Sequence, residues 1–500
     1  MTRHDVVVVG AGFGGLTMGA ALRAAGIRDF VILEEGDDVG GVWRENTYPG
    51  CACDVPSHLY SFAFDPHRDA EVRFPDQGSI LEYMRAVVER NGLRQHIRSN
   101  TSVTAANYSD ADGTWTLTTA DGQHLHTAAV VWAVGQLHRP AVPDVPGAHS
   151  FAGAAFHSAR WDRGADLTGH VAVVGTGSSA AQMVPELART AASVTVYQRT
   201  PSWILPKPAA RFGPVSRWAL ATVPGLHRLY RAGLYLGADL VLAPVMRGGW
   251  SARPARWLAR AHLRRQVPDR ALRDRLTPDY RIGEKRVLMD NGFYPALSLP
   301  HVELVTDPVE QVTSDGVRTV GGAHRRADVI VWATGFHAPE FLGGVEVRGQ
   351  GGTDLHAHWS EQGRPEAFFG LAVPGFPSMY LIAGPHSFTP ANSNPSMKDH
   401  QVRYIMGCLD LAARLGAPVA VTPAAMAGYR RWLDTALART VWPDGVPSWF
   451  KRDSDGPVTN PWPSSVREFE RRLHAHDPAD TFVEVRVSHT AAQPDRGVRP

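Results

Sequence analysis

Four short apolar runs dominate the hydrophobic pattern of this chain. In residues 5–9 (DVVVV) all four positions after Asp5 are apolar, and residues 171–174 (VAVV) are continuously apolar, which is typical of strands buried on both faces of a parallel sheet. Each is followed by a glycine-rich turn and then by a helix-compatible stretch. Residues 128–135 (AAVVWAVG) and 327–335 (ADVIVWATG) are near-copies, each a predicted strand closed by glycine. Because opening and closing signals both occur twice, the pattern predicts two nucleotide-binding α/β units.

The order of these signals predicts how the chain is divided. The first unit covers residues 1–148, and the second covers 149–335 with a basic helical insertion at about 205–280. Residues 336–488 are left to return to the first unit, and the polar residues 489–500 are expected to form a disordered tail. The expected fold class is therefore α/β, with two Rossmann-like dinucleotide-binding domains.

The insertion contains the most apolar segment, AGLYLGADLVLAPVM, at residues 232–246. It is shorter than the roughly 20 residues of a transmembrane helix, and it is interrupted by Asp239 and Pro244. We therefore expect no transmembrane segment, and we favour a buried helix or a substrate-cavity wall over an element on a membrane surface. The arginines nearby alternate with Trp, Leu and Ala at helical intervals, which favours solvated helix faces over a polyanion site.

Composition narrows the classes of function. The 500 residues include 51 basic and 49 acidic side chains, a balance that argues against a nucleic-acid partner. Three cysteines, Cys51, Cys53 and Cys408, give no disulfide framework and no zinc-ligand pattern, so buried thiols and no metal site are expected. The first strand begins almost at the start of the sequence, which leaves no room for a signal peptide and favours a cytoplasmic location.

The first glycine-rich turn has the sequence Gly10-Ala11-Gly12-Phe13-Gly14-Gly15 and matches G-x-G-x-x-G between a strand and a helix. Its first glycine makes the tight turn, its second lets the backbone approach a pyrophosphate, and its last permits close helix packing. The next strand ends at Glu34, where a carboxylate would accept bonds from ribose hydroxyls. The alternative is an ordinary βαβ turn.

The second turn, Gly175-Thr176-Gly177-Ser178-Ser179-Ala180, has the permitted G-x-G-x-x-A form. The strand after its helix ends in Arg199 rather than in an acid. A guanidinium pairs with a 2′-phosphate, which favours NADP over NAD, although Arg199 could also be a surface arginine. Two dinucleotide sites in one chain suggest a flavin in one and a nicotinamide in the other.

Longer motifs carry a family resemblance. The spacing Phe151-x-Gly153-x-x-x-His157-x-x-x-Trp161-Asp162 resembles the fingerprint of type I Baeyer–Villiger monooxygenases, which are class B flavoprotein monooxygenases related to the flavin-containing monooxygenases. Further matching motifs are Gly40-Gly41-Val42-Trp43, Tyr48-Pro49-Gly50 with Asp54, and Ala333-Thr334-Gly335. The resemblance spans most of residues 5–465. It implies a discontinuous FAD domain interrupted by an NADP domain.

The resemblance also implies roles for individual residues. Arg286 falls at the active-site arginine, which would stabilise an anionic C4a-peroxyflavin, and Asp54 would be its partner. Lys285 would lie near the NADP 2′-phosphate. Simpler interpretations stay open: a surface charge for Lys285, a structural role for Arg286 and a turn cap for Asp54. His157 and Trp161 are better interpreted as domain-linker residues than as a general base.

The predicted catalytic residues are therefore Arg286 and Asp54, and no metal ligand is predicted. The predicted cofactor-binding residues are Gly10, Gly12, Gly15, Glu34, Gly41, Val42, Trp43, Asp54, Tyr60, Val103, Thr176, Gly177, Ser178, Ser179, Gln182, Arg199, Thr200, Lys285 and Thr334.

The predicted function is an NADPH- and O2-dependent FAD monooxygenase that converts a ketone into an ester or lactone. The alternatives are oxygenation of a nitrogen or sulfur atom, a flavin-dependent reductase or oxidase, and a flavin-binding redox sensor. The expected partners are a small-molecule ketone and O2, with the oligomeric state left open. The segment after Gly384 departs from the usual family sequence, so substrate size and polarity are open too.

Overall fold

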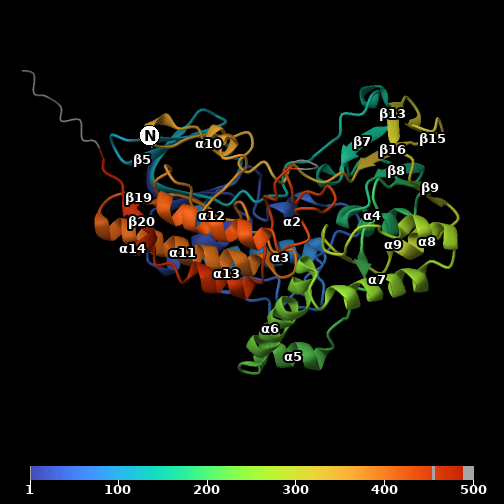
Figure 1. Cartoon of the computed structure of the whole chain (residues 1–500), viewed down its shortest axis with the longest axis horizontal. Coiled ribbons are helices and arrows are strands. Elements are labelled where there is room, and N and C mark those ends of the chain that lie inside the picture. Colours follow the sequence, from blue (N-terminus) through green and yellow to red (C-terminus); the bar gives the residue numbers. More distant parts are fainter. Residues whose placement is uncertain (1, 453–455, 488–500) are drawn as a thin grey trace, which may run out of the picture.

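The computed structural model describes residues 2–452 and 456–487, so the predicted tail at 489–500 lies outside the described residues. Its elements form two lobes, with a helical projection below them (Figure 1). The larger sheet within the described residues has eight strands in the order β17-β4-β5-β6-β1-β2-β3, with β18 also paired to β6. These strands are β1 (Thr2–Val9), β2 (Phe30–Leu33), β3 (Ile97–Arg98), β4 (Val103–Ser109), β5 (Thr114–Thr119), β6 (His124–Trp132), β17 (Glu346–Arg348) and β18 (Met379–Leu381).

Strand β1 lies inside this sheet because its second half is apolar on both faces. Residues 6–9 are all buried and pair in parallel with β2 on one side and β6 on the other. Strands β17 and β18 come from beyond residue 335, and they pair in parallel with β4 and β6. The chain therefore leaves this sheet and later returns to it.

The second sheet is parallel throughout, with the order β12-β9-β8-β16-β7 among the described residues. Its strands are β7 (Ala154–His157), β8 (His170–Val174), β9 (Ser193–Tyr197), β12 (Val302–Val305) and β16 (Val329–Trp332). Helix α4 (Ser178–Leu187) connects β8 to β9, as a βαβ unit requires. The whole sheet is formed between the two passes of the chain through the first sheet.

The other elements cover these sheets and join them. The long helix α11 (Asn394–Leu415) packs against α1 (Phe13–Ala24), which follows the first glycine-rich turn. Further helices are α2 (Val42–Glu45), α3 (Gln77–Arg90), α9 (Phe293–Leu297), α10 (Leu355–Glu361), α12 (Pro423–Leu437), α13 (Val466–Leu473) and α14 (Pro478–Thr481), with short 3-10 turns η1 (Arg94–His96), η2 (Ala148–Ser150), η3 (Ser158–Arg160) and η6 (Gln350–Gly352). Short strands are β10 (Ile204–Leu205) paired with β11 (Leu288–Met289), the meander β13 (Val309–Thr313), β14 (Gly316–Thr319) and β15 (His324–Arg326), and β19 (Val419–Val421) paired with β20 (Phe482–Glu484).

The insertion is helical, and part of it projects from the body (Figure 1). It contains α5 (Pro214–Thr222), α6 (Leu226–Gly237), the π-helical turn η4 (Ala238–Leu242), the 3-10 turn η5 (Ala243–Arg247), α7 (Ala252–Gln266) and α8 (Arg270–Leu276). The expectation of a buried helix at 232–246 is wrong for one face, because Leu236, Leu240 and Val241 are exposed. By length and composition, the continuous helical run Leu226–Arg247 could cross a membrane.

Candidate active site

The first glycine-rich turn is shaped by its glycines. Gly10 has φ +104°, and a Cβ atom on it would lie 2.7 Å from the Ala133 carbonyl oxygen. A Cβ atom on Gly15 would lie 1.8 Å from the Gly10 carbonyl oxygen, so the helix can approach the strand only without a side chain there. Gly12 faces Gly41, whose φ of +54° also favours glycine. Helix α1 begins at Phe13 with no side-chain cap, which leaves its first N–H groups for an anion.

Glu34 lies directly beneath this turn. One of its carboxylate oxygens accepts a hydrogen bond from the Ala11 amide at 2.8 Å. The other accepts hydrogen bonds from the Gly36 amide at 2.9 Å and from the Arg44 guanidinium at 2.6 Å. The end of β2 therefore holds a buried carboxylate against the glycine-rich turn, at the place where a ribose would lie.

The remaining residues predicted for the flavin side lie in the same unit. Val42 and Trp43 begin α2, and the Trp43 indole donates a hydrogen bond to the Tyr60 hydroxyl at 3.1 Å. Burial raises the pKa of Tyr60 well above its ordinary value, which keeps the hydroxyl neutral. Val103 is the buried first residue of β4. Trp43 and Tyr60, which contact one another where α2 begins after Gly41, are suited to holding an uncharged, planar group.

We expect the substitution Gly15→Ala to abolish flavin retention. The new methyl group would overlap the Gly10 carbonyl, so either the turn or the start of α1 must shift. Purified protein should lose most of its bound flavin, measured as visible absorbance per protein, with a lowered Tm. The control Gly213→Ala, at a glycine with open space around it, should retain flavin like the unaltered chain. Full flavin retention by Gly15→Ala would contradict this assignment.

The second glycine-rich turn has a comparable shape but a different charge. Gly175 has φ +121°, and nothing lies within 4 Å of a Cβ atom placed on Gly177. The Thr176 hydroxyl donates a hydrogen bond to the Thr200 carbonyl at 3.1 Å, which joins the turn to the end of β9. Helix α4 begins at Ser178 and Ser179 without a side-chain cap. The arrangement leaves room for a phosphate at the start of this helix.

Arg199 and Lys285 bring positive charge to this second turn. Arg199 is exposed at the end of β9, and Lys285 is half-buried with its ammonium 5.4 Å from the centre of the Tyr280 ring. Burial, and then the positive charge of Arg199, lower the pKa of Lys285 to about 8. Two cations that repel one another are suited to sharing an anion, and a 2′-phosphate is such an anion.

This lowered pKa predicts a pH effect on NADPH binding. Lys285 loses its charge as the pH rises through about 8, so its attraction for a 2′-phosphate is present below that pH and lost above it. The KM for NADPH should therefore rise severalfold from neutral pH to about pH 10, while the KM for NADH changes little. In Lys285→Arg, which keeps its charge, the rise should disappear. An equal rise for NADPH in both proteins would contradict the role of Lys285.

Arg286 and Asp54 meet where the two units face one another. The Arg286 guanidinium donates from Nη2 to both Asp54 oxygens, at 2.7 and 2.8 Å. Their side chains are 24% and 18% exposed. Burial alone would lower the pKa of Arg286 and raise that of Asp54, but their mutual attraction outweighs burial and shifts both pKa values the other way. Both groups are therefore held charged.

Two residues that sequence reasoning missed complete this junction. The Phe388 ring lies 5.8 Å from the Arg286 guanidinium carbon, which places an aromatic face beside the cation. The charge of Lys207 also helps to lower the pKa of Asp54. Neither residue lies in a recognisable motif. Both are far from Asp54 in the sequence, so no local pattern indicates that they lie near the Arg286–Asp54 pair.

Gln182 joins the two units directly. Its side-chain oxygen accepts hydrogen bonds from the Tyr48 hydroxyl at 2.9 Å and from the Ala52 amide at 3.2 Å. Its side-chain nitrogen donates to the Ala52 carbonyl at 2.9 Å. Gly50 packs so closely on α4 that a Cβ atom there would lie 2.5 Å from the Gln182 carbonyl oxygen. The predicted cofactor-binding residue Gln182 therefore positions the loop that leads to Asp54.

His157 and Thr334 hold the link between the units. The Nε2 atom of the buried His157 is 2.8 Å from the Gly335 carbonyl oxygen, and its Nδ1 atom accepts from the Ala159 amide. Burial lowers the pKa of His157, which keeps the ring neutral. The Thr334 hydroxyl donates to the Ala141 carbonyl at 2.6 Å. These contacts agree with a linker role for His157 and leave it no free nitrogen to act as a base.

The segment from Trp442 to Trp449 packs on the loop that carries Lys285 and Arg286. The Trp442 indole donates to the Gly283 carbonyl at 3.0 Å, and the Val446 amide donates to the Glu284 carboxylate at 3.2 Å. Trp449 makes an edge-on contact with Phe388, with ring centres 4.9 Å apart. These contacts therefore hold the loop that leads to Arg286 in place.

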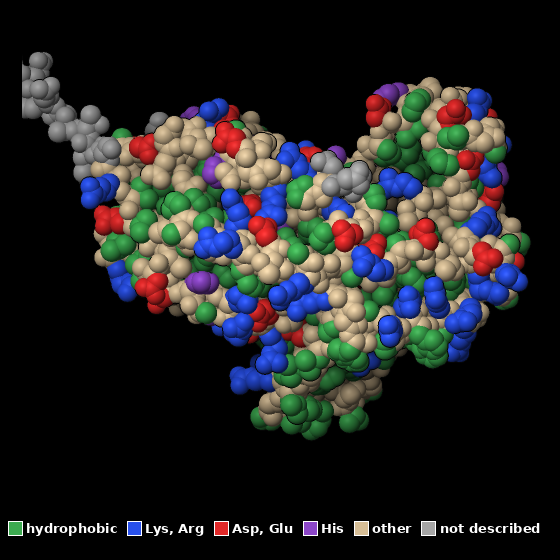
Figure 2. Space-filling model, viewed as in Figure 1, with side chains coloured by type: hydrophobic (Ala, Val, Ile, Leu, Met, Phe, Trp, Pro, Cys, Tyr) green, Lys and Arg blue, Asp and Glu red, His purple; other side chains and the backbone are tan. Residues whose placement is uncertain are grey.

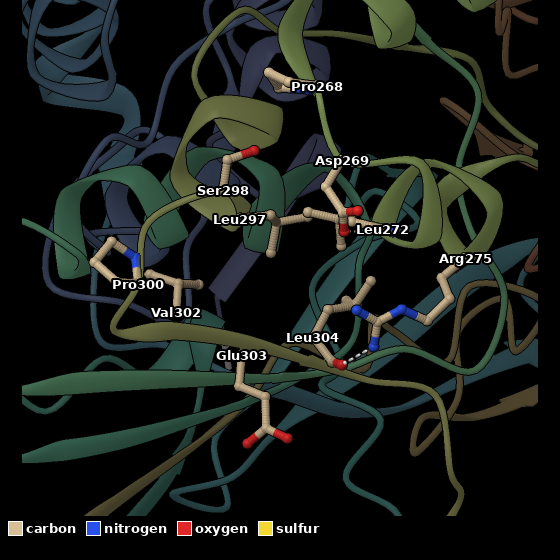
Figure 3. A pocket seen from close by; sticks show the side chains of 10 residues that line it. All are labelled: Pro268, Asp269, Leu272, Arg275, Leu297, Ser298, Pro300, Val302, Glu303 and Leu304. Atoms are coloured by element: carbon tan, nitrogen blue, oxygen red, sulfur yellow. Dashed lines mark hydrogen bonds between the residues drawn. The ribbon is translucent and has the colours of Figure 1, made fainter.

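A surface pocket of the second lobe is separate from this site. Figure 3 shows its ten lining residues, which surround an opening near β12 and α8. They are Pro268, Asp269, Leu272, Arg275, Leu297, Ser298, Pro300, Val302, Glu303 and Leu304. None of them is a predicted site residue. A much smaller cavity lies at the junction of the units and is lined by Asp54, Ser178 and Gln182 among others.

Comparisons with known proteins show the family of this chain. The pyridine nucleotide-disulphide oxidoreductase family matches residues 7–223. A Baeyer–Villiger monooxygenase of Streptomyces coelicolor is 36% identical over 98% of this chain and 96% of its own length. One from Pseudomonas aeruginosa is 36% identical over 95% of this chain and 90% of its own. The chain belongs to the family of Baeyer–Villiger monooxygenases.

Solved structures of this family share the fold. An oxidised steroid monooxygenase bound to NADP matches 97% of this chain and 99% of its own, with 27% identity and a TM-score of 0.86. A cyclohexanone monooxygenase from Rhodococcus bound to NADP+ matches with the same coverage, 28% identity and a TM-score of 0.86. The predicted family, the α/β fold class with two Rossmann-like units and the class of flavin-dependent monooxygenase are confirmed. The roles of individual site residues stay predictions.

Proposed function

We propose that this enzyme uses NADPH and O2 to insert one oxygen atom beside the carbonyl of a small-molecule ketone, which gives an ester or a lactone. The observation that carries this proposal is the pairing of Arg286 with both oxygens of Asp54 at the junction of the two glycine-rich units. The prediction of FAD and NADPH as cofactors is confirmed by relatives described as FAD-binding monooxygenases and by solved neighbours with both cofactors bound.

The residues of this chain fit both cofactors. The uncapped start of α1 is suited to the pyrophosphate of FAD, because Gly10, Gly12 and Gly41 leave room for it there. Glu34, beneath the turn, is suited to the ribose. The uncapped start of α4, with Arg199 and Lys285 nearby, suits NADPH. When bound, these cofactors supply the electrons that activate O2. We propose that residues 1–148 and 336–488 hold FAD and that 149–335 hold NADPH.

Arg286 and Asp54 supply fixed charge at the junction. A guanidinium held in one orientation stabilises negative charge that develops on the transferred oxygen atom and on the carbonyl oxygen of the ketone. Asp54 holds that orientation and keeps the arginine from carrying an unpaired charge in a partly buried site. The aromatic rings of Phe388 and Trp449 help to exclude water from the same place.

The substitution Asp54→Asn tests the positioning of Arg286. Asparagine keeps the shape of the side chain but removes the charge that orients the guanidinium, so kcat for ester formation should fall about tenfold to a hundredfold. The KM for NADPH should change little, because the 2′-phosphate is assigned to Arg199 and Lys285, whose charges the substitution does not alter. Product formation is measured by mass spectrometry and NADPH binding by initial rates. An unchanged kcat would remove Asp54 from the proposed machinery.

The ketone assignment is tested with purified, FAD-loaded enzyme, NADPH and a panel of cyclic, linear and polycyclic ketones that also includes a sulfide. Esters or lactones are expected in an O2-dependent reaction. Sulfoxide as the only product would instead support heteroatom oxygenation. A cytoplasmic location of the enzyme stays part of the proposal.

A further inference from the structure

The projecting helices α5 and α6, with the turn η4 that continues α6, carry an unusual apolar surface, which we name the α5–α6 face. Its exposed members are Val215, Trp218, Val223, Leu229, Leu236, Leu240 and Val241. Trp218 is 63% exposed, Leu229 is 72% exposed and Leu240 is 58% exposed. Figure 2 shows hydrophobic side chains gathered over the tip of the projection, at the bottom of the view. Of the large hydrophobic residues exposed in the described chain, most lie between 215 and 258, so this exposure is concentrated in one region.

The part of the face that follows α5 is one side of an amphipathic helix. Leu229, Leu236 and Leu240 are spaced by seven and four residues, so they lie on one stripe of the helical run Leu226–Arg247. The opposite side is held by the protein. There, Arg231 donates to the His58 carbonyl at 3.0 Å and to the Ser61 hydroxyl at 2.7 Å.

A second anchor fixes the same side further along the run. The buried Asp239 accepts hydrogen bonds from the Asn392 side chain at 2.7 Å and from the backbone amides of Val466 and Arg467 at 3.1 and 2.9 Å. A helix held along its length in this way cannot cross a bilayer unless these hydrogen bonds to the rest of the protein break. It can lie in the plane of a membrane surface, with its apolar stripe turned outward.

The segment of sequence that contains the face is almost entirely positive in charge, although Arg217 on α5 pairs with Glu71 from outside it. From residue 206 to residue 268 the sequence contains eleven Lys or Arg residues, and its single acidic residue is Asp239, which is buried. Exposed arginines are Arg228 on α6 and Arg253 and Arg256 on α7. Lys and Arg side chains lie above and beside the apolar tip in Figure 2. An apolar stripe with a basic surround and an exposed tryptophan has the chemistry that anionic lipid surfaces bind.

We propose that the α5–α6 face docks this enzyme on the surface of an anionic membrane. The apolar stripe enters the boundary between headgroups and acyl chains, and the arginines contact the headgroup phosphates. A second copy of the chain is a poorer occupant. A two-fold dimer through this face would place the same basic surround against itself, and like charges repel.

The test is co-sedimentation of the FAD-loaded enzyme with vesicles of phosphatidylcholine alone or with about one third phosphatidylglycerol. The enzyme should sediment with the anionic vesicles and stay in solution with the neutral ones, and added salt should weaken its binding. The triple variant Trp218→Ser/Leu229→Ser/Leu240→Ser should bind at least about tenfold more weakly. Because these side chains are exposed, the variant should keep its flavin content and its Tm.

Two further variants sharpen the result. The matched control Val142→Ser/Val320→Ser/Val483→Ser changes three exposed apolar residues outside α5–α7, at 52%, 63% and 51% exposure, and should bind like the unaltered enzyme. Charge reversal in Arg228→Glu/Arg253→Glu/Arg256→Glu should weaken binding to anionic vesicles by about fivefold or more for each arginine.

Three outcomes would overturn the proposal. The unaltered enzyme could fail to sediment with anionic vesicles, or the apolar variant could bind as strongly as the control. The unaltered enzyme could also self-associate without binding vesicles, with the apolar variant monomeric. In that last case the face would be a contact between copies. None of these readouts depends on which substrate the enzyme oxidises.

Discussion

Replacing Arg286 by alanine should abolish ester formation and leave the reduction of the flavin by NADPH intact. The guanidinium is fixed by both oxygens of Asp54 and lies beside the Phe388 ring, and it makes no hydrogen bond to either glycine-rich turn among the described residues. Removing one preorganised charge that faces developing negative charge costs about a hundredfold to a thousandfold in rate. We expect a loss at the upper end, because the variant also leaves Asp54 without its partner.

The measurement compares flavin bleaching by NADPH under anaerobic conditions with product formed in air. The variant should be bleached at nearly the normal rate and should consume NADPH in air with release of hydrogen peroxide instead of ester. Normal flavin content and bleaching exclude a folding defect. The control Arg270→Ala, at a side chain that is 88% exposed, should retain full activity. Lactone formation at the normal rate by Arg286→Ala would remove this residue from the mechanism.

Replacing Arg199 and Lys285 together should remove the preference of the enzyme for NADPH over NADH. Both cations lie at the second glycine-rich turn, and the lowered pKa of Lys285 shows that burial and the charge of Arg199 act on it. A charge-assisted hydrogen bond contributes about 1.5–3 kcal/mol. Loss of both should reduce kcat/KM for NADPH about a hundredfold to a thousandfold or more.

The selectivity is measured as the ratio of kcat/KM for NADPH to kcat/KM for NADH in Arg199→Ala/Lys285→Met. The NADH value should change by less than about threefold, because NADH has no 2′-phosphate. Arg189→Ala removes another exposed arginine of the same unit, one that pairs with Glu186, and should leave the ratio unchanged. An equal loss for NADPH and NADH would show a general defect of the site and contradict the assignment.

The sequence predicted the two α/β units because each depends on local signals. The apolar runs at 5–9 and 171–174 lie within β1 and β8, and the near-copies at 128–135 and 327–335 contain the ends of β6 and β16. Buried parallel strands must be apolar on both faces, so their positions can be predicted from continuous apolar runs in the sequence. The return of the chain after residue 335 could be expected from the layout, but the partners of β17 and β18 could not, because three-residue strands leave almost no pattern.

The contacts at the active-site junction are harder to predict from the sequence. The pairing of Arg286 with Asp54 came from the family resemblance, since 232 residues separate them and no periodicity links them. Lys207 and Phe388 were missed, because each reaches the junction through contacts between distant segments. For residues 232–246 of the insertion the sequence favours a buried helix or a cavity wall, because an apolar composition is the same whether a helix faces a core or a membrane surface.

Isotopic labelling shows whether one atom of O2 is inserted beside a ketone carbonyl. Purified, FAD-loaded enzyme is supplied with NADPH, isotopically labelled O2 and the ketone panel, and the products are analysed by mass spectrometry. We expect an ester or lactone that carries one labelled oxygen atom, with one NADPH consumed per product. Consumption of NADPH that yields only hydrogen peroxide, with every ketone recovered unchanged, would contradict it.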